Sequence, residues 1–232
     1  MNVKQASDIS HSLRRFMSGW VALLALSASL ACGPTAAQAK VTPPQQMVED
    51  TTHELLQRFQ KDRTELKTHP DRLYDLVNDI VVPHFDFVRM SHWVLGRAAW
   101  SQMSHEQKTR FVLAFRTLLV RTYATALLQY QDQKINFLPL RGDPSSGHVE
   151  VRSTVAQPGG QSVAINYSLH QRHGQWLVYD VNVDGISLLS NYRSSFSDEI
   201  NKTGINQLIA RLEQRVQDKS SPDKSSQDKQ SQ

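Results

Sequence analysis

The sequence predicts an α+β fold, in which helices pack against one face of an antiparallel sheet of about four strands. Apolar residues recur at helical spacing from residue 49 to residue 131, and the period changes to two between residues 133 and 183. Short turns that contain glycine, at 158–160 and 172–174, join the predicted strands. Strands joined by consecutive hairpins form an antiparallel sheet.

The first 39 residues have the composition of a secretory signal peptide. Basic residues come first, residues 16–31 are apolar and uncharged, and Ala37-Gln38-Ala39 is a small-x-small cleavage site. The apolar run is too short for a comfortable membrane span. Cys32 is the only cysteine, and an alternative is cleavage directly before it with lipidation of its side chain. The match to a lipoprotein site is poor, because Ser29 occupies the position three residues before the cysteine where Leu is expected. We expect cleavage after Ala39, which leaves a mature chain without cysteine.

The charge of the mature chain argues against nucleic-acid binding. Loss of Lys4, Arg14, Arg15 and Asp8 with the leader leaves 23 basic and 21 acidic residues, a net charge of +2.

A single domain over residues 40–216 is long enough to bury an ordinary core. Residues 217–232 consist almost entirely of Asp, Lys, Ser and Gln, a composition that predicts a disordered tail.

Helices are predicted over residues 49–68, 70–82, 84–96, 105–131 and 190–216. Pro83 ends the second helix because proline cannot continue it. Ser104 and Gln107 form a capping box that opens the longest helix, and Gly204 interrupts the last one. The long helix is apolar on a broad face, which a sheet, or a sheet together with an apolar ligand, would cover.

Strands are predicted over residues 135–140, 148–156, 162–172 and 175–183. The last strand is expected to place Leu177, Tyr179, Val181 and Val183 on one face. It ends at Asp184-Gly185, a pair suited to a turn with positive φ.

No motif for catalysis or metal binding stands out. The sequence has no Gly-x-Ser-x-Gly, no glycine-rich phosphate loop and no His-Glu-x-x-His. His170 and His173 fall across a predicted hairpin turn and are expected to be exposed rather than to converge on a metal. His84 and Asp86 could suggest a catalytic His–Asp dyad, but side chains two residues apart diverge in any regular structure. Asp86 is instead expected to begin a helix.

Tyr192 and Arg193 follow the last predicted strand and allow two interpretations. They could lie at a pocket rim, with the guanidinium placed for a phosphate. Alternatively, Arg193 could form a structural ion pair with Asp198 or Glu199.

The segment from Trp176 to Phe196, WLVYDVNVDGISLLSNYRSSF, resembles the signature of the MlaC-type periplasmic phospholipid carriers, also called the toluene-tolerance auxiliary family. Further similarity is found in three places: 83–87 (PHFDF), Val94-Leu95-Gly96 with Trp100, and the pattern F-x-x-x-F-x-x-L-L-x-x-T-Y-A-x-x-L within 111–130. The resemblance covers about residues 48–212.

This resemblance implies a strongly bent antiparallel sheet that encloses an apolar cavity with the helices, similar to nuclear-transport-factor-like cones. It implies a soluble carrier in the periplasm of a Gram-negative bacterium, with phospholipid as cargo and no cofactor. Such carriers move lipid between an outer-membrane lipoprotein complex and an inner-membrane ABC-transporter complex, and so maintain the lipid asymmetry of the outer membrane.

The apolar faces supply the expected cavity lining, although for each of these residues the sequence alone favours plain core over ligand contact. The expected lipid-binding residues are Phe115, Leu119, Tyr123, Leu127, Val149, Val151, Val155, Ile165, Tyr167, Leu169, Val181 and Val183, with Tyr192 and Arg193 as a possible headgroup rim.

Two other functions remain open from the sequence. An enzyme on the same fold would need an acid or base on the pocket wall, for which only Tyr167 or Tyr179 is available. An adaptor for proteins, such as a lipoprotein carrier, would need an exposed apolar groove.

Overall fold

The computed structural model describes residues 43–157 and 159–218, so the predicted signal peptide and most of the predicted tail lie outside it. Helices α2 to α6 precede the sheet and α7 and α8 follow it, which confirms the α+β prediction. The helices are α2 (Pro44–Lys61), α3 (Arg63–Thr68), α4 (Pro70–Ile80), α5 (Phe87–Gln102), α6 (His105–Ala124), α7 (Leu188–Thr203) and α8 (Ile205–Asp218), with short 3-10 helices η1 (Val82–His84), η2 (Thr125–Gln129) and η3 (Pro144–Ser146).

The sheet is antiparallel and its strands follow one another in chain order. They are β1 (Ile135–Arg141), β2 (His148–Val155), β3 (Val163–Arg172), β4 (Gln175–Val183) and β5 (Ile186–Ser187). The two-residue strand β5 was not predicted. It follows the expected turn at Asp184-Gly185, where φ is 48° and 87°.

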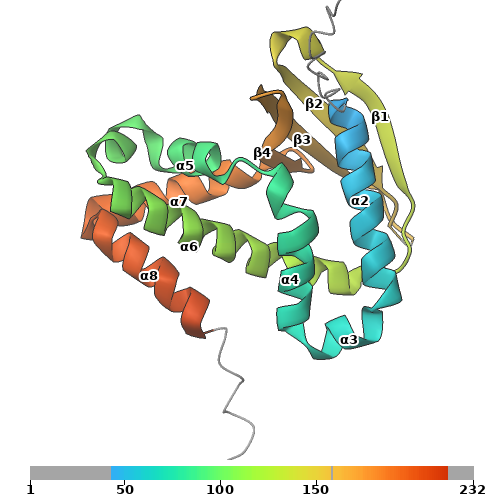
Figure 1. The fold of residues 1–232 in the computed structure, drawn as a ribbon, viewed down its shortest axis with the longest axis horizontal. Coiled ribbons are helices and arrows are strands. Elements are labelled where there is room, and N and C mark those ends of the chain that lie inside the picture. Colours follow the sequence, from blue (N-terminus) through green and yellow to red (C-terminus); the bar gives the residue numbers. More distant parts are fainter. Residues whose placement is uncertain (1–42, 158, 219–232) are drawn as a thin grey trace, which may run out of the picture. The chain divides into compact units, whose positions relative to one another are not determined.

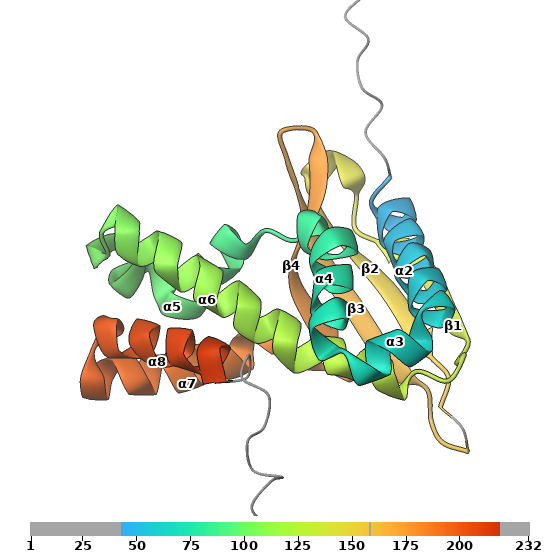
Figure 2. The ribbon, with the colours of Figure 1, turned by 60° about the horizontal axis from the view of Figure 1, so that its bottom comes forward.

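Helix α2 lies along one face of the sheet, and α4 lies between α2 and α6 (Figure 1). Helices α5, α6, α7 and α8 pack together beside β4 (Figure 2). The run His105–Gln129 is long and apolar enough to cross a membrane by composition alone. Here α6 is the central helix, in contact with α4, α5 and α8.

Local sequence determines where α6 begins and where α7 ends. The capping box at the start of α6 is present: Gln107 N–H donates to Ser104 Oγ (3.1 Å), and Ser104 N–H donates to Gln107 Oε1 (2.8 Å). Gly204, with φ of 82°, ends α7 and allows α8 to turn back along it.

The buried apolar side chains form three clusters. The bundle cluster joins α5, α6, α7 and α8 around Phe111, Phe115 and Phe196. The α4 cluster joins α2, α3, α4 and α6 around Phe59, Leu66 and Leu73. The sheet cluster lies between α2 and the strands, and its buried members are Met47, Val48, Val149, Val151, Leu169, Trp176 and Val178.

A β-bulge in β4 changes which side chains face the helices. The register pairs Ser168 with Asp180 but Leu169 with Val178, so Tyr179 is an extra residue in the ladder. Because the extra residue inverts the alternation, Val178 belongs to the same cluster as Val181, whereas Tyr179 packs against the bundle cluster. The prediction that Leu177 and Tyr179 share a face with Val181 and Val183 was therefore wrong.

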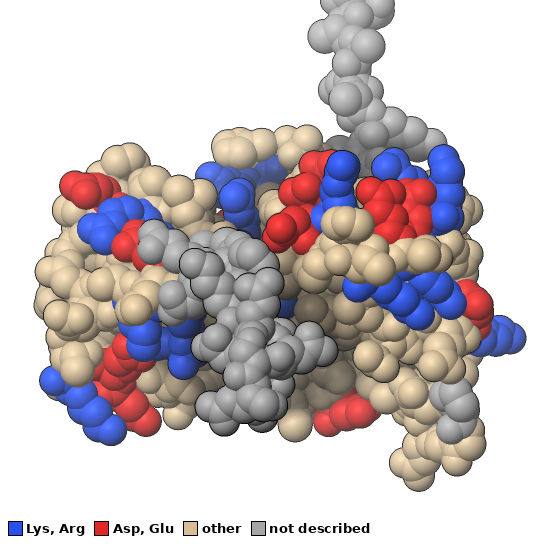
Figure 3. Space-filling model, turned by 90° about the horizontal axis from the view of Figure 1, so that it is seen from below, with Lys and Arg blue, Asp and Glu red and all other residues tan. Residues whose placement is uncertain are grey.

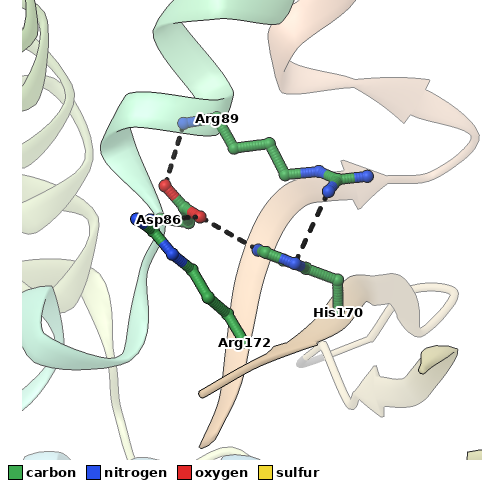
Figure 4. A network of polar contacts seen from close by, with 4 residues as sticks. All are labelled: Asp86, Arg89, His170 and Arg172. Atoms are coloured by element: carbon green, nitrogen blue, oxygen red, sulfur yellow. Dashed lines mark hydrogen bonds and ion pairs between the residues drawn. The ribbon is translucent and has the colours of Figure 1, made fainter.

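Asp86 attaches the start of α5 to the edge of the sheet. Its N–H donates to the Val178 carbonyl (2.9 Å), beside a bridge between Phe85 and Val178. Its side chain caps α5, since Oδ1 accepts from Arg89 N–H (2.9 Å). Its other oxygen, Oδ2, lies 3.0 Å from His170 Nε2 and 3.4 Å from Arg172 Nη1 (Figure 4). One residue therefore links α5, β3 and β4.

His170 is buried in this network, so the expectation that it is an exposed turn residue was wrong; His173, in the turn itself, is exposed. Burial and, after it, the neighbouring Arg89 guanidinium lower the pKa of His170 from its ordinary value. The neutral ring donates from Nε2 to Asp86 and leaves Nδ1 to accept from Arg89 (3.5 Å).

Asp86→Ala is expected to lower the free energy of unfolding by about 2–4 kcal/mol, because it removes a helix cap and leaves the buried His170 without its partner. Urea denaturation measures the change. Asp198→Ala, at an exposed position on α7, is the matched control and should change stability by less than about 0.5 kcal/mol. Equal effects of the two substitutions would contradict the role given to Asp86.

The lowered pKa of His170 predicts that stability falls as pH decreases through about 6.5. Below that pH the unfolded chain binds a proton that the folded chain excludes, so the unfolded state gains stability. His84, whose pKa is also lowered by burial, acts in the same direction. Urea midpoints between pH 7.5 and 5.5 should fall less steeply in His170→Gln, and least in the double variant with His84→Gln. An unchanged slope in both variants would disprove the assignment.

Candidate apolar binding site

A cavity of about 280 Å³ lies where the three apolar clusters meet. It is enclosed by α2, α4, η1, α5, α6, η2, β4 and the start of α7. The lining residues are Leu55, Val77, Val81, Val82, Phe85, Phe87, Met90, Leu119, Val120, Tyr123, Ala124, Leu127, Val181, Val183 and Leu188. Three separately packed clusters leave a gap at their junction, and this gap is the cavity.

The cavity wall is almost wholly apolar. Among its lining residues, all in the described part of the chain, only Tyr123 has a side chain with an N–H or O–H group. Viewed from below, a recess near the middle of the surface is lined mostly by uncharged residues, with charged side chains on both sides (Figure 3). Such a wall suits a hydrocarbon ligand.

The side chain of Tyr123 neighbours that of Tyr192. Burial and then this neighbour raise the pKa of Tyr123 to about 12, so its hydroxyl stays protonated near neutral pH. The Tyr192 ring is held in turn against Phe115 (5.3 Å between centroids) and Phe196 (5.5 Å). The pair therefore offers a fixed hydrogen-bonding group at an otherwise apolar wall.

The mouth of the cavity is marked by lining residues that remain in contact with solvent. Tyr123 is 46% exposed and Val183 is 40% exposed, whereas Leu119, Val120 and Ala124 are buried. A ligand that fills the cavity would therefore have its outer end beside Tyr123 and Val183.

The predicted lining divides into two groups. Leu119, Tyr123, Leu127, Val181 and Val183 line the cavity. The other seven lie elsewhere. Phe115 is buried in the bundle cluster, and Val149, Val151 and Leu169 are buried in the sheet cluster under α2. Tyr167 packs against the sheet cluster, and Val155 and Ile165 are half-buried outside the cavity. Helix α2 packs against β2, and its Met47 and Val48 share the sheet cluster with Val149, Val151 and Leu169, so these strand residues face α2 instead of the cavity. Contact between lipid and any of these residues stays a prediction.

Sequence reasoning missed the contribution of α4, η1 and α5 to the wall. Val77 lies in α4, Val81 directly follows that helix, and Val82 begins η1. Phe85 and Phe87 come from the PHFDF motif. The motif was recognised, but without the position of β4 nothing indicated that these rings face a cavity.

The predicted rim pair is divided between two sites. Tyr192 reaches the cavity only through Tyr123. Arg193 lies on a different surface, where Nη1 donates to the Trp93 carbonyl (2.8 Å). The proposed ion pair with Glu199 is absent among the residues the structure describes, because Arg211 binds that carboxylate instead.

The fold and this cavity define a class of α+β proteins that enclose an apolar ligand. The sequence profile described as "MlaC protein" matches residues 49–214, and the chain belongs to the MlaC family.

Two relatives and one solved structure are similar to this chain over most of its length. "Toluene tolerance protein ttg2D" of Pseudomonas putida is 30% identical over 78% of this chain and 82% of its own length. "Intermembrane phospholipid transport system binding protein MlaC" of Haemophilus influenzae is 26% identical over 75% of this chain and 82% of its own. A phospholipid-binding protein from Ralstonia solanacearum, solved in complex with a phospholipid, superposes with a TM-score of 0.71; it is 31% identical and covers 78% of this chain and 100% of its own.

Val183→Asp is expected to weaken binding of a fluorescent apolar probe, N-phenyl-1-naphthylamine, by at least about tenfold, because a carboxylate would then stand on the apolar wall. Ile186→Asp is the matched control. Ile186 is the ladder partner of Val183 and is 60% exposed, but it does not line the cavity. Equal losses in both variants would show that the probe binds elsewhere. Leu169→Asp is unsuitable, since Leu169 is wholly buried and its loss would unfold the sheet cluster.

Proposed function

We propose that this protein is a periplasmic phospholipid carrier that holds acyl chains in the apolar cavity and shuttles lipid between an outer-membrane and an inner-membrane complex. The observation that supports it most directly is a wall of fifteen lining residues with a single hydrogen-bonding side chain, Tyr123. Its membership of a family with a phospholipid-bound structural neighbour supplies the ligand class.

The energetics of lipid transfer explain why such a wall is needed. A diacyl lipid has roughly thirty methylenes, and exposure of each to water costs about 0.8 kcal/mol. An aqueous compartment is therefore a barrier unless a protein replaces the bilayer around the chains. The carrier need not bind the chains better than a bilayer does, since tighter binding would prevent release. A wall with few polar anchors meets both requirements.

The polar part of the lipid would lie at the mouth, beside the Tyr123–Tyr192 pair. A protonated tyrosine can donate to an ester carbonyl or a phosphate oxygen of any phospholipid, so this contact favours no particular headgroup. Tyr123 would thus orient the lipid without selecting it.

The present cavity must widen to hold a whole diacyl lipid. At about 280 Å³ it is just below the range of pockets for drug-sized ligands, about 300–1,000 Å³, and a phospholipid is larger than such ligands. Widening is least costly where the wall is a boundary between clusters, because each cluster can then move with its own packing intact. We expect α4 to move relative to α5 and β4 on loading.

An enzyme on this fold is the weaker alternative. Acid–base catalysis needs a group that titrates near the working pH and faces the substrate. Among the residues the structure describes, the lining contains no Asp, Glu, His, Lys or Cys. Tyr123, with a pKa raised to about 12, is a poor base near neutral pH.

Mass spectrometry of organic extracts, from protein purified from the periplasm without detergent, tests the proposal. We expect close to one phospholipid per protein in the parent and in Ile186→Asp, and little in Val183→Asp. An empty extract from folded parent protein would refute phospholipid carriage and favour a protein-binding role.

Two substitutions of Tyr123 distinguish the contribution of its ring to lipid binding from that of its hydroxyl. Tyr123→Phe keeps the apolar surface and should retain phospholipid, with faster transfer to acceptor vesicles because one hydrogen bond of about 1 kcal/mol is lost. Tyr123→Asp should lose the lipid, since it places a charge in the wall. Unchanged transfer rates in Tyr123→Phe would show that the hydroxyl does not touch the lipid. Circular dichroism checks the fold of each variant.

A further inference from the structure

The surface of α5 that faces away from the cavity carries a basic concave site, here called the basic groove. It has a volume of about 470 Å³ and is lined by Arg89, His92, Trp93, Gly96, Arg97 and Arg193. Met90 and Phe87 line the lipid cavity from the same helix, so one helix separates the two sites.

The arginines of the basic groove lack acidic partners. Among the described residues, none of the three guanidinium groups, of Arg89, Arg97 and Arg193, forms an ion pair with Asp or Glu. Two carboxyl groups line hollows that adjoin the groove. Asp86 shares one with Arg89 but is buried and bound to His170 and Arg172, and Asp198 shares the other with Arg193 and Trp93. Three positive charges on one concave surface favour an anionic partner.

Two of these arginines are held in place by other contacts. Arg193 donates to the Trp93 carbonyl and its guanidinium lies 4.9 Å from the centre of the Trp93 ring. Arg89 lies over the Tyr179 ring at 4.6 Å and contacts His170. Gly96 interrupts α5 with φ of 76°, and a Cβ there would lie 3.6 Å from Arg193 Nη2. Preorganised side chains lose little entropy on binding, which favours affinity.

The groove is flanked by exposed apolar surface. Trp93 is 41% exposed and Val88, in the adjoining hollow with Arg89 and His92, is 50% exposed. Exposed tryptophan beside arginine is the composition of energetically dominant sites in protein–protein interfaces. We propose that the basic groove is a docking site for a protruding acidic segment of a partner protein, with Asp or Glu side chains against the arginines and an apolar side chain against Val88 or Trp93.

A protein segment fits this surface better than an anionic membrane does. The groove is concave, and one face of the Trp93 ring is covered by Arg193, whereas an interfacial anchor would project from the surface as a whole ring. A segment that enters a groove on the outer face of α5 also leaves the cavity mouth at Tyr123 and Val183 open, so that docking and lipid exchange can occur together. The proposal stands on the groove itself and goes beyond the lipid-carrier function.

The test uses fluorescence anisotropy of a labelled peptide in which Asp and Glu alternate with Leu, and of the same peptide with Asn and Gln in place of the acids. We expect the purified protein to bind only the acidic peptide, with affinity that falls as salt is added. Arg97→Glu with Arg193→Glu should weaken binding by at least about tenfold. The control, Arg58→Glu with Lys67→Glu, makes the same charge change at exposed positions on α2 and α3 and should leave binding nearly unchanged.

Arg97→Glu alone, at an exposed side chain, serves if the double variant fails to fold. Absence of binding to the acidic peptide, or equal losses in the groove and control variants, would overturn the proposal. The proposal would also be overturned if the protein sedimented with phosphatidylglycerol vesicles in a way that depends on the groove arginines but did not bind the peptide. Phospholipid content, measured in every variant, should remain that of the parent, which separates loss of docking from loss of lipid binding.

Discussion

The position of α5 depends on Asp86, which binds the helix to the sheet through its backbone and both carboxyl oxygens. The backbone bond fixes Asp86 to β4 at the bulge, and the side chain fixes it to His170 and Arg172 of β3. These bonds therefore fix both the position of α5 and its orientation about its own axis. That orientation decides which of its residues face the cavity and which face solvent, so both sites of the molecule depend on this one anchor.

The cavity exists because the domain has three apolar clusters instead of one continuous core. Each cluster packs around its own aromatic and aliphatic side chains, and the cavity lies where residues of all three clusters meet. Interior gaps are costly in a protein that has no ligand, because their lining atoms lose contacts. An apolar ligand restores those contacts, which gives a physical reason for phospholipid carriage. The tyrosine pair at the mouth adds one polar contact without making the wall polar.

Helix α5 has two chemically different faces. Phe87 and Met90 form part of the lipid wall, whereas Arg89, His92 and Trp93 form part of the basic groove. The docking proposed for the basic groove would take place on the opposite face of α5 from the cavity wall, so that a docked partner would leave the mouth open.

The sequence by itself determined the fold class, most element boundaries, the capping box at Ser104, the turn at Asp184-Gly185 and the family, because these depend on local periodicity and short motifs. It also identified the α6 and β4 residues that line the cavity, such as Leu119, Tyr123 and Val181. Only the tertiary structure decided that Val149, Val151 and Leu169 lie beneath α2 and that Phe85 and Phe87 reach the cavity. The bulge at Tyr179, the anchor between Asp86 and His170 and the separation of Arg193 from Tyr192 were equally beyond the sequence. An apolar side chain beside a cavity has the same sequence pattern as one in a filled core, and what distinguishes them is which distant segment packs against it.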